Sequence, residues 1–152
     1  MSNPHSKKVR KAVFPVAGLG TRYLPATKVM PKEMLPLVDR PLIQRAVEEA
    51  QEAGIEEFIF VAGRNKSLIT EHFEFQPELQ EALREKGKHD LLAKVVSTDI
   101  PSGNLLTCIQ QKAMGLGHAV WCARKLVGDE PFVLSLVDVM TLSDTPCMTQ
   151  MM

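Results

Sequence analysis

The sequence predicts an α/β fold built around an open, mostly parallel β-sheet. Four short apolar runs, at residues 10–17, 56–63, 104–111 and 131–138, have the composition of strands that are buried on both faces of a sheet. Segments with helical patterning separate these runs, and strands that alternate with helices are typical of parallel βαβ units. With 152 residues, of which 45% are hydrophobic, the chain is long enough for one domain with its own core.

Helices are predicted at residues 41–54, 67–73, 77–88 and 115–128. The first is the clearest, because Pro41 opens it, apolar residues form one face and Gly54 closes it. After Asp138 no pattern continues, so we expect residues 139–152 to form a loose tail.

The charge balance and the cysteines narrow the function classes. The chain has 18 basic and 18 acidic residues and a net charge of zero, so we expect neither nucleic acid nor a membrane as a partner. Residues 1–8 form a polar arm without the apolar stretch of a signal peptide. The three cysteines are odd in number and form no C-x-x-C pair, which favours free thiols in the cytoplasm over a zinc site.

A long irregular segment, residues 14–41, follows the first predicted strand and contains two glycines and five prolines. Loops of this length inside a compact domain are either functional or disordered. The apolar patch "EMLPLV" has to pack somewhere, so we expect the loop to be ordered. The prolines stiffen it and reduce the entropy that is lost when a ligand binds.

The start of this loop has the features of a phosphate site. Gly18 and Gly20 allow backbone N–H groups to approach a phosphate closely, and Arg22, Lys28 and Lys32 supply positive charge. The motif is neither the dinucleotide fingerprint, because Tyr23 stands where the third glycine is required, nor a Walker loop. A plain turn is the alternative for the glycines, and a solvated side chain is the alternative for Lys28.

Four segments of the sequence resemble one enzyme family. They are "AGLGTRYLPATKVMPKEMLPLVDRPLIQ", "GRNKSLITEHFE", "QQKAMGLGHAVWCAR" and "VGDEPFVLSLVD". Their order and spacing are similar to those of bacterial UTP–glucose-1-phosphate uridylyltransferases, also called UDP-glucose pyrophosphorylases. The resemblance extends from about Lys8 to Asp138. It departs from the family at Val137, where a proline is usual, and at Ile109, where an arginine is common.

The resemblance implies a Rossmann-like nucleotidyltransferase fold, a three-layer sandwich whose mostly parallel sheet has the strand order 3-2-1-4. Residues 9–138 are expected to form the N-terminal part of the nucleotidyltransferase domain, between the arm at 1–8 and a tail at 139–152 unlike the family. Family members are longer, so we expect the chain to be truncated. We also expect an exposed, association-prone edge strand at 131–138 and little activity from the chain alone.

The resemblance also implies a reaction, a cofactor and a set of site residues. The reaction transfers UMP from UTP to glucose 1-phosphate and releases pyrophosphate, with Mg²⁺ as cofactor and a homo-oligomer as the family's assembly. The implied residues are Arg22 and Lys32 for catalysis, Ala17, Gly18, Gly20, Glu33, Gln110 and Gly115 for the nucleotide, and Asp138 for the metal.

Topology supports this assignment independently. In the order 3-2-1-4 the first and fourth strands are neighbours, and ligands bind beyond the carboxyl ends of strands at such a reversal. The glycine loop and Asp138 should therefore meet. A phosphate monoester is already ionised and needs no general base, so His118 is interpreted as a packed or capping residue and Trp121 as a core or interface residue.

Two other interpretations stay open. The chain could be a nucleotide-binding fragment of the enzyme that holds UTP without turnover. It could also be an unrelated α/β domain whose glycine turn binds a different phosphate.

Overall fold

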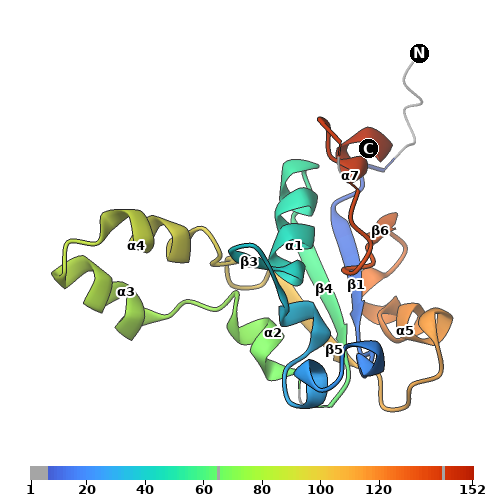
Figure 1. The fold of residues 1–152 in the computed structure, drawn as a ribbon. Helices are drawn as coiled ribbons and strands as arrows, with labels where there is room; N and C mark the ends of the chain where they lie inside the picture. Colours follow the sequence, from blue (N-terminus) through green and yellow to red (C-terminus); the bar gives the residue numbers. More distant parts are fainter. Residues whose placement is uncertain (1–6, 65, 142) are drawn as a thin grey trace.

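A four-stranded parallel sheet forms the centre of the protein (Figure 1). The computed structural model describes residues 7–64, 66–141 and 143–152. The sheet has the order β5-β4-β1-β6, in which every neighbouring pair is parallel. Its strands are β1 (Lys11–Val16), β4 (Glu57–Ala62), β5 (Leu105–Ile109) and β6 (Phe132–Leu134). These are the four predicted strands, so the predicted order 3-2-1-4 is confirmed.

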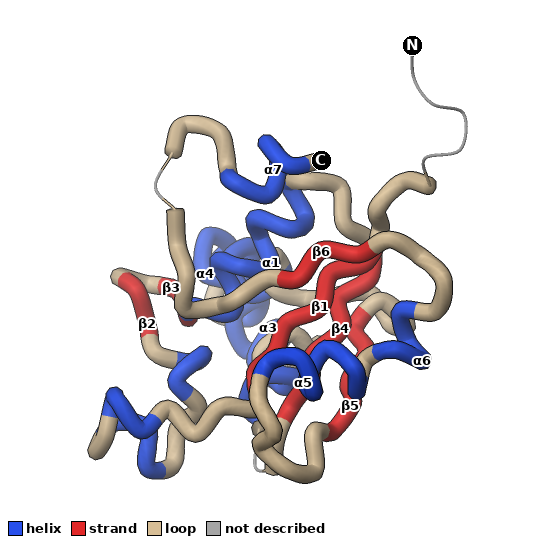
Figure 2. The backbone as a smooth tube through the Cα atoms, turned by 90° about the vertical axis from the view of Figure 1, so that its right-hand side faces the viewer, coloured by secondary structure: helices blue, strands red, loops and turns tan. Residues whose placement is uncertain are grey.

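Helices cover both faces of the sheet, which makes the fold a three-layer sandwich as predicted (Figures 1 and 2). On one face, Phe14 of β1 packs in a core with Val47 of α1 (Leu42–Glu52). On the other face, Val13 of β1 packs with Ala119 of α5 (Leu116–Cys122). Successive side chains of a strand point to opposite faces, so the continuous apolar run of β1 supplies two separate cores.

Pro15 lies in the central strand β1, although a proline inside a strand predicts an edge position. The Val13 carbonyl accepts a hydrogen bond from the Ser135 amide, so alternate residues of β1 turn their backbone groups toward β6. The paired part of β1 and β6 ends at Val13 and Leu134. Pro15 therefore lacks its donor on the side that β6 has already left, and the ladder with β4 stays intact.

The loop after β1 is ordered, as predicted, but by structure that has no sequence period. It consists of three single-turn 3-10 helices and a small antiparallel hairpin. The 3-10 helices are η1 (Thr21–Tyr23), η2 (Ala26–Lys28) and η3 (Lys32–Met34), and the hairpin pairs β2 (Pro36–Leu37) with β3 (Arg40–Pro41).

Two helices form an arm that projects from the body after α2 (Ser67–Glu71) (Figure 1). They are α3 (Pro77–Glu85), which was predicted, and α4 (His89–Val96), which was not. Among the arm's helical residues only Gln80 is buried, and its amide donates to the Asp99 carboxylate at 2.7 Å.

The C-terminal region differs from the expectation in two places. The helix predicted at 115–128 divides at Ala123 into α5 and α6 (Arg124–Val127). The loose tail is wrong for α7 (Cys147–Met151), because Met148 is buried in the core and its amide donates to Glu49 Oε1 at 2.9 Å. In the part of the chain that the structure describes, no helix is long and apolar enough to cross a lipid bilayer.

Candidate functional site

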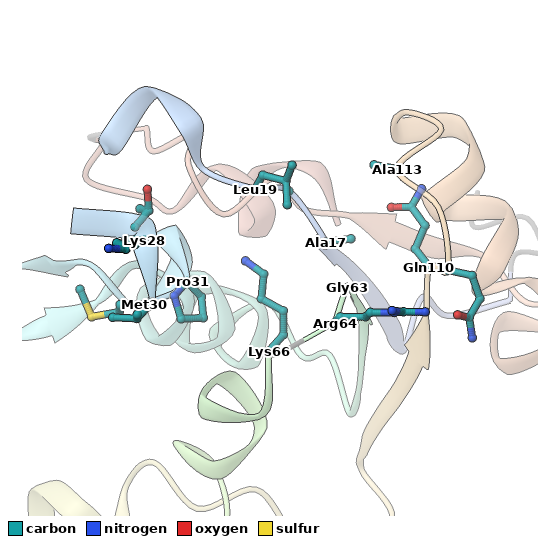
Figure 3. A pocket seen from close by; sticks show the side chains of 14 residues that line it. Ala17, Leu19, Lys28, Met30, Pro31, Gly63, Arg64, Lys66, Gln110 and Ala113 are labelled. Carbon is teal, nitrogen blue, oxygen red and sulfur yellow. The ribbon is translucent and has the colours of Figure 1, made fainter. Parts of the chain in front are cut away.

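A cavity of about 400 Å³ opens at the carboxyl end of the sheet, where the predicted site residues lie (Figure 3). Its walls come from the segments that follow β1, β4 and β5. The wall residues that matter here are Gly18, Lys28, Arg64, Lys66, Gln110 and Ala113. Figure 3 shows Lys28 and Met30 on one side of the cavity and Gln110 on the other, with Ala17 and Gly63 between them. The position at the ends of parallel strands is the one that topology predicts.

Gly20 is required by the shape of the loop. Its φ of +64° lies in the left-handed region, and its carbonyl accepts a hydrogen bond from Thr27 Oγ1 at 2.7 Å. A Cβ there would lie 3.2 Å from side-chain carbons of both Thr27 and Lys32. Gly18 has more room, since its Cβ would lie 3.7 Å from Lys32 Cε. Gly20 thus allows the loop to fold tightly against Lys32.

The structure brings Arg22, Lys32 and Asp138 together from distant parts of the chain. Lys32 Nζ donates to Asp138 Oδ2 at 2.7 Å, and an Arg22 guanidinium nitrogen lies 3.9 Å from the same oxygen. The Lys32 hydrogen bond is the main cause that lowers the pKa of Asp138, although partial burial acts in the opposite direction. Arg22 is otherwise exposed, with 81% of its side chain accessible. A carboxylate held ionised beside two cations can bind a metal ion or face an anion together with them.

Glu33 lies beneath the cavity rather than on its wall. It is 1% exposed, and its Oε2 accepts a hydrogen bond from Lys66 Nζ at 3.0 Å. Its other oxygen, Oε1, is buried without a hydrogen-bond partner. The ion pair ties the segment after β4 to η3, which also contains Lys32. Whether Glu33 contacts a nucleoside stays a prediction.

Gln110 and Gly115, which were predicted to lie beside a base, contact each other. Gln110 is 7% exposed and lines the cavity. Its backbone amide donates to the Ala62 carbonyl, and its side-chain nitrogen donates to the Gly115 carbonyl at 3.2 Å. The same nitrogen lies 3.0 Å from His118 Nδ1. Gln110 is therefore held from both β4 and the start of α5.

The sequence interpretation missed Arg64 and Lys66 as site residues, although both line the cavity. A signal was available, because these cations follow directly after an apolar strand, as Arg22 and Lys32 do. Lys28, which was left open, also lines the cavity. The two segments approach closely, since a Cβ on Gly63 would lie 3.1 Å from the Ala17 carbonyl oxygen.

Comparison with known proteins agrees with this geometry. The family model described as nucleotidyl transferase matches residues 11–147. The chain belongs to the nucleotidyl transferase family. Within that family, it is 54% identical over 146 residues to a UTP–glucose-1-phosphate uridylyltransferase of Bacillus subtilis (strain 168), a match that covers 96% of this chain and 50% of the relative. A uridylyltransferase of the same name from Staphylococcus haemolyticus (strain JCSC1435) is 52% identical over 147 residues, with the same two coverages.

Solved structures of nucleotidyl transferases show the same fold. A UTP-bound UGPase from Acinetobacter baumannii superposes with a TM-score of 0.88 at 42% identity and covers 95% of this chain and 51% of that chain. A UDP-glucose pyrophosphorylase complexed with UDP-glucose superposes with a TM-score of 0.74 at 38% identity, with coverages of 95% and 52%. The resemblance inferred from sequence is confirmed. The chain spans about half the length of the curated relatives it matches.

Proposed function

We propose that this chain forms the nucleotide-binding part of a UTP–glucose-1-phosphate uridylyltransferase, which transfers UMP from UTP to glucose 1-phosphate and releases pyrophosphate. The observation that carries the proposal is the meeting of Arg22, Lys32 and Asp138 beside a cavity that contains the glycine loop and Gln110. Its support from relatives is the 54% identity to an enzyme of that name.

The cations have a role that follows from the reaction. In nucleotidyl transfer, negative charge grows on the bridging oxygen as pyrophosphate leaves, and fixed positive charge lowers that barrier. Lys32 is assigned to the phosphate under attack and Arg22 to the departing pyrophosphate. The attacking oxygen of glucose 1-phosphate is already ionised, so no residue has to remove a proton.

The remaining assigned residues hold the nucleotide. The backbone at Ala17, Gly18 and Gly20 is assigned to the phosphates, because amide groups of a glycine turn approach anions closely. Gln110 and Gly115 are assigned to the base, and Glu33 to the nucleoside.

Asp138 is the residue that would hold Mg²⁺. Within the described residues, no group of three or more His, Cys, Asp or Glu side chains could hold a metal by itself. That fits a magnesium ion bound through one carboxylate together with substrate phosphates, which is its common mode in proteins. When bound, the ion would neutralise phosphate charge during transfer. The lowered pKa of Asp138 keeps the carboxylate in the form that binds a cation.

Calorimetry of UTP binding in the presence of Mg²⁺ tests the proposal. We expect Lys32→Ala and Asp138→Asn each to weaken binding by about tenfold or more, since a charged hydrogen bond contributes roughly 1.5–3 kcal/mol. Lys94→Ala on the exposed arm helix α4 is the control and should change nothing. Wild-type chain that does not bind UTP would refute the proposal.

Pyrophosphate release after addition of glucose 1-phosphate then separates the two remaining alternatives. Release above background indicates a catalytic chain. Tight binding of UTP without release identifies a nucleotide-binding fragment instead.

A further inference from the structure

The side-chain amide of Gln110 has both of its donor positions engaged inside the protein. Its Nε2 lies 3.2 Å from the Gly115 carbonyl oxygen and 3.0 Å from His118 Nδ1. An amide NH₂ group has two hydrogens, so these two partners use them fully. Gln110 Oε1 accepts no hydrogen bond from the described residues.

The orientation of this amide follows from the chemistry of its neighbours. A backbone carbonyl can only accept a hydrogen bond, so the amide atom beside Gly115 must be the nitrogen. If Oε1 took that place, two acceptors would face each other. The nitrogen near His118 must then also donate, which makes Nδ1 of His118 an unprotonated acceptor with the ring proton on Nε2.

The His118 ring is itself held in place. It stacks on Trp121 with the ring centroids 5.9 Å apart and the planes at 21°, and the Arg124 guanidinium lies 3.4 Å from the centroid of the Trp121 ring. The Cys122 sulfur lies 3.9 Å from His118 Nδ1. This stack on the outer side of α5 has no part in the proposed chemistry, but it fixes the direction of the ring.

We propose that His118 is a positioning residue that sets the nucleobase specificity of the cavity through Gln110. By accepting from Nε2, His118 and Gly115 leave Oε1 as the polar atom that Gln110 can offer to a ligand. An acceptor at that place selects a pyrimidine that has an N–H at position 3, as uracil has. Cytosine presents an acceptor there instead. This inference rests on the proposed function, because it concerns the base of the same nucleotide.

Without an acceptor at position 118, the amide can rotate by 180° and offer Nε2 to the ligand. The discrimination between the two bases should then fall. An unpaired buried polar group costs enough that restoring or losing one matched contact changes affinity by about tenfold.

The test compares UTP and CTP binding to the 152-residue chain in the presence of Mg²⁺. We expect His118→Leu to reduce the CTP-to-UTP ratio of dissociation constants by about tenfold. His118→Asn, which retains an acceptor close to the Nδ1 position, should preserve most of the ratio. His89→Leu makes the same chemical change on the arm and is the matched control. Urea unfolding of each variant confirms that it is folded.

Three outcomes decide the inference. A wild-type ratio in His118→Leu, with UTP still bound, overturns the positioning role and leaves the proposed function untouched. Nitrogen NMR that finds the ring proton of His118 on Nδ1 overturns it without any nucleotide. A wild-type chain that binds neither nucleotide overturns the proposed function and this inference with it.

Discussion

The ion pair between Lys66 and Glu33 should contribute more to stability than any exposed pair of similar geometry. Its Nζ–Oε2 distance is 3.0 Å, and the two side chains are 10% and 1% exposed. Replacing Lys66 by Met leaves the Glu33 carboxylate buried with neither oxygen paired, because Oε1 already lacks a partner. Removal of one member of a buried pair costs about 3–5 kcal/mol.

The control for this prediction is the pair between Lys8 and Glu56. Its distance is 3.1 Å, but its side chains are 66% and 50% exposed. Exposed pairs contribute about 0–1 kcal/mol, so Lys8→Met should lower the free energy of unfolding by no more than that. For a chain of this length, about 3 kcal/mol corresponds to a fall in Tm of roughly 6–12 °C in Lys66→Met.

Urea unfolding followed by circular dichroism, without nucleotide, measures these changes. The double variant Lys66→Met/Glu33→Met should return to within about 1 kcal/mol of wild type, because apolar groups of similar volume replace a buried ion pair well. The coupling energy should therefore exceed about 2 kcal/mol. The reasoning is refuted if Lys66→Met loses no more than Lys8→Met, or if the losses of the two single variants add in the double variant.

Three further predictions follow from the site and its surroundings. Gly20→Ala should lower the free energy of unfolding by about 1–3 kcal/mol, more than Gly87→Ala, because both have a positive φ but only Gly20 has close neighbours; equal losses would rule out the contacts as the cause. Lys32→Met should raise the pKa of Asp138 toward its ordinary value, seen by carbon NMR titration, and should flatten the loss of stability below about pH 4, since a lowered carboxyl pKa stabilises above the unfolded value and is lost as the pH falls through the folded value. Burial lowers the pKa of His72, so the free energy of unfolding should decrease as the pH falls below about 6.5, where the unfolded histidine takes up a proton first. His72→Gln should remove that slope, and an unchanged slope would place its origin elsewhere.

The sheet was predictable because its strands are buried on both faces. The runs that became β1 and β4 are apolar at nearly every position, and such a run has few other places in a soluble fold. β6 is shorter than predicted, since only Phe132–Leu134 pairs with β1 although the apolar run continues to Val137. Apolar composition indicates burial, but it does not say where a strand leaves its neighbour.

The helix α4 and the three 3-10 turns were not predictable for different reasons. The segment that forms α4 has no side-chain cap and buries no residue, so the strongest signals of a helix are missing. A single 3-10 turn such as η3 is shorter than any period that a sequence pattern can show.

The candidate site was predictable where topology alone determines it. Lys32 and Asp138 follow neighbouring strands of the order 3-2-1-4, so their meeting required only the order. The pair of Lys66 with Glu33 joins two loops whose relative position depends on packing, and no spacing in the sequence indicates it. His118 was interpreted as a packed residue because a histidine in a helix gives no sign of the glutamine it meets.

The arm formed by α3 and α4 has a consequence for how this protein can change over evolutionary time. Because its helices bury only Gln80, its residues contribute little to either core. Insertions, deletions and drift are tolerated where few buried contacts depend on the segment. The arm can therefore lengthen, shrink or acquire new surface chemistry while the sheet and its cavity remain under separate selection.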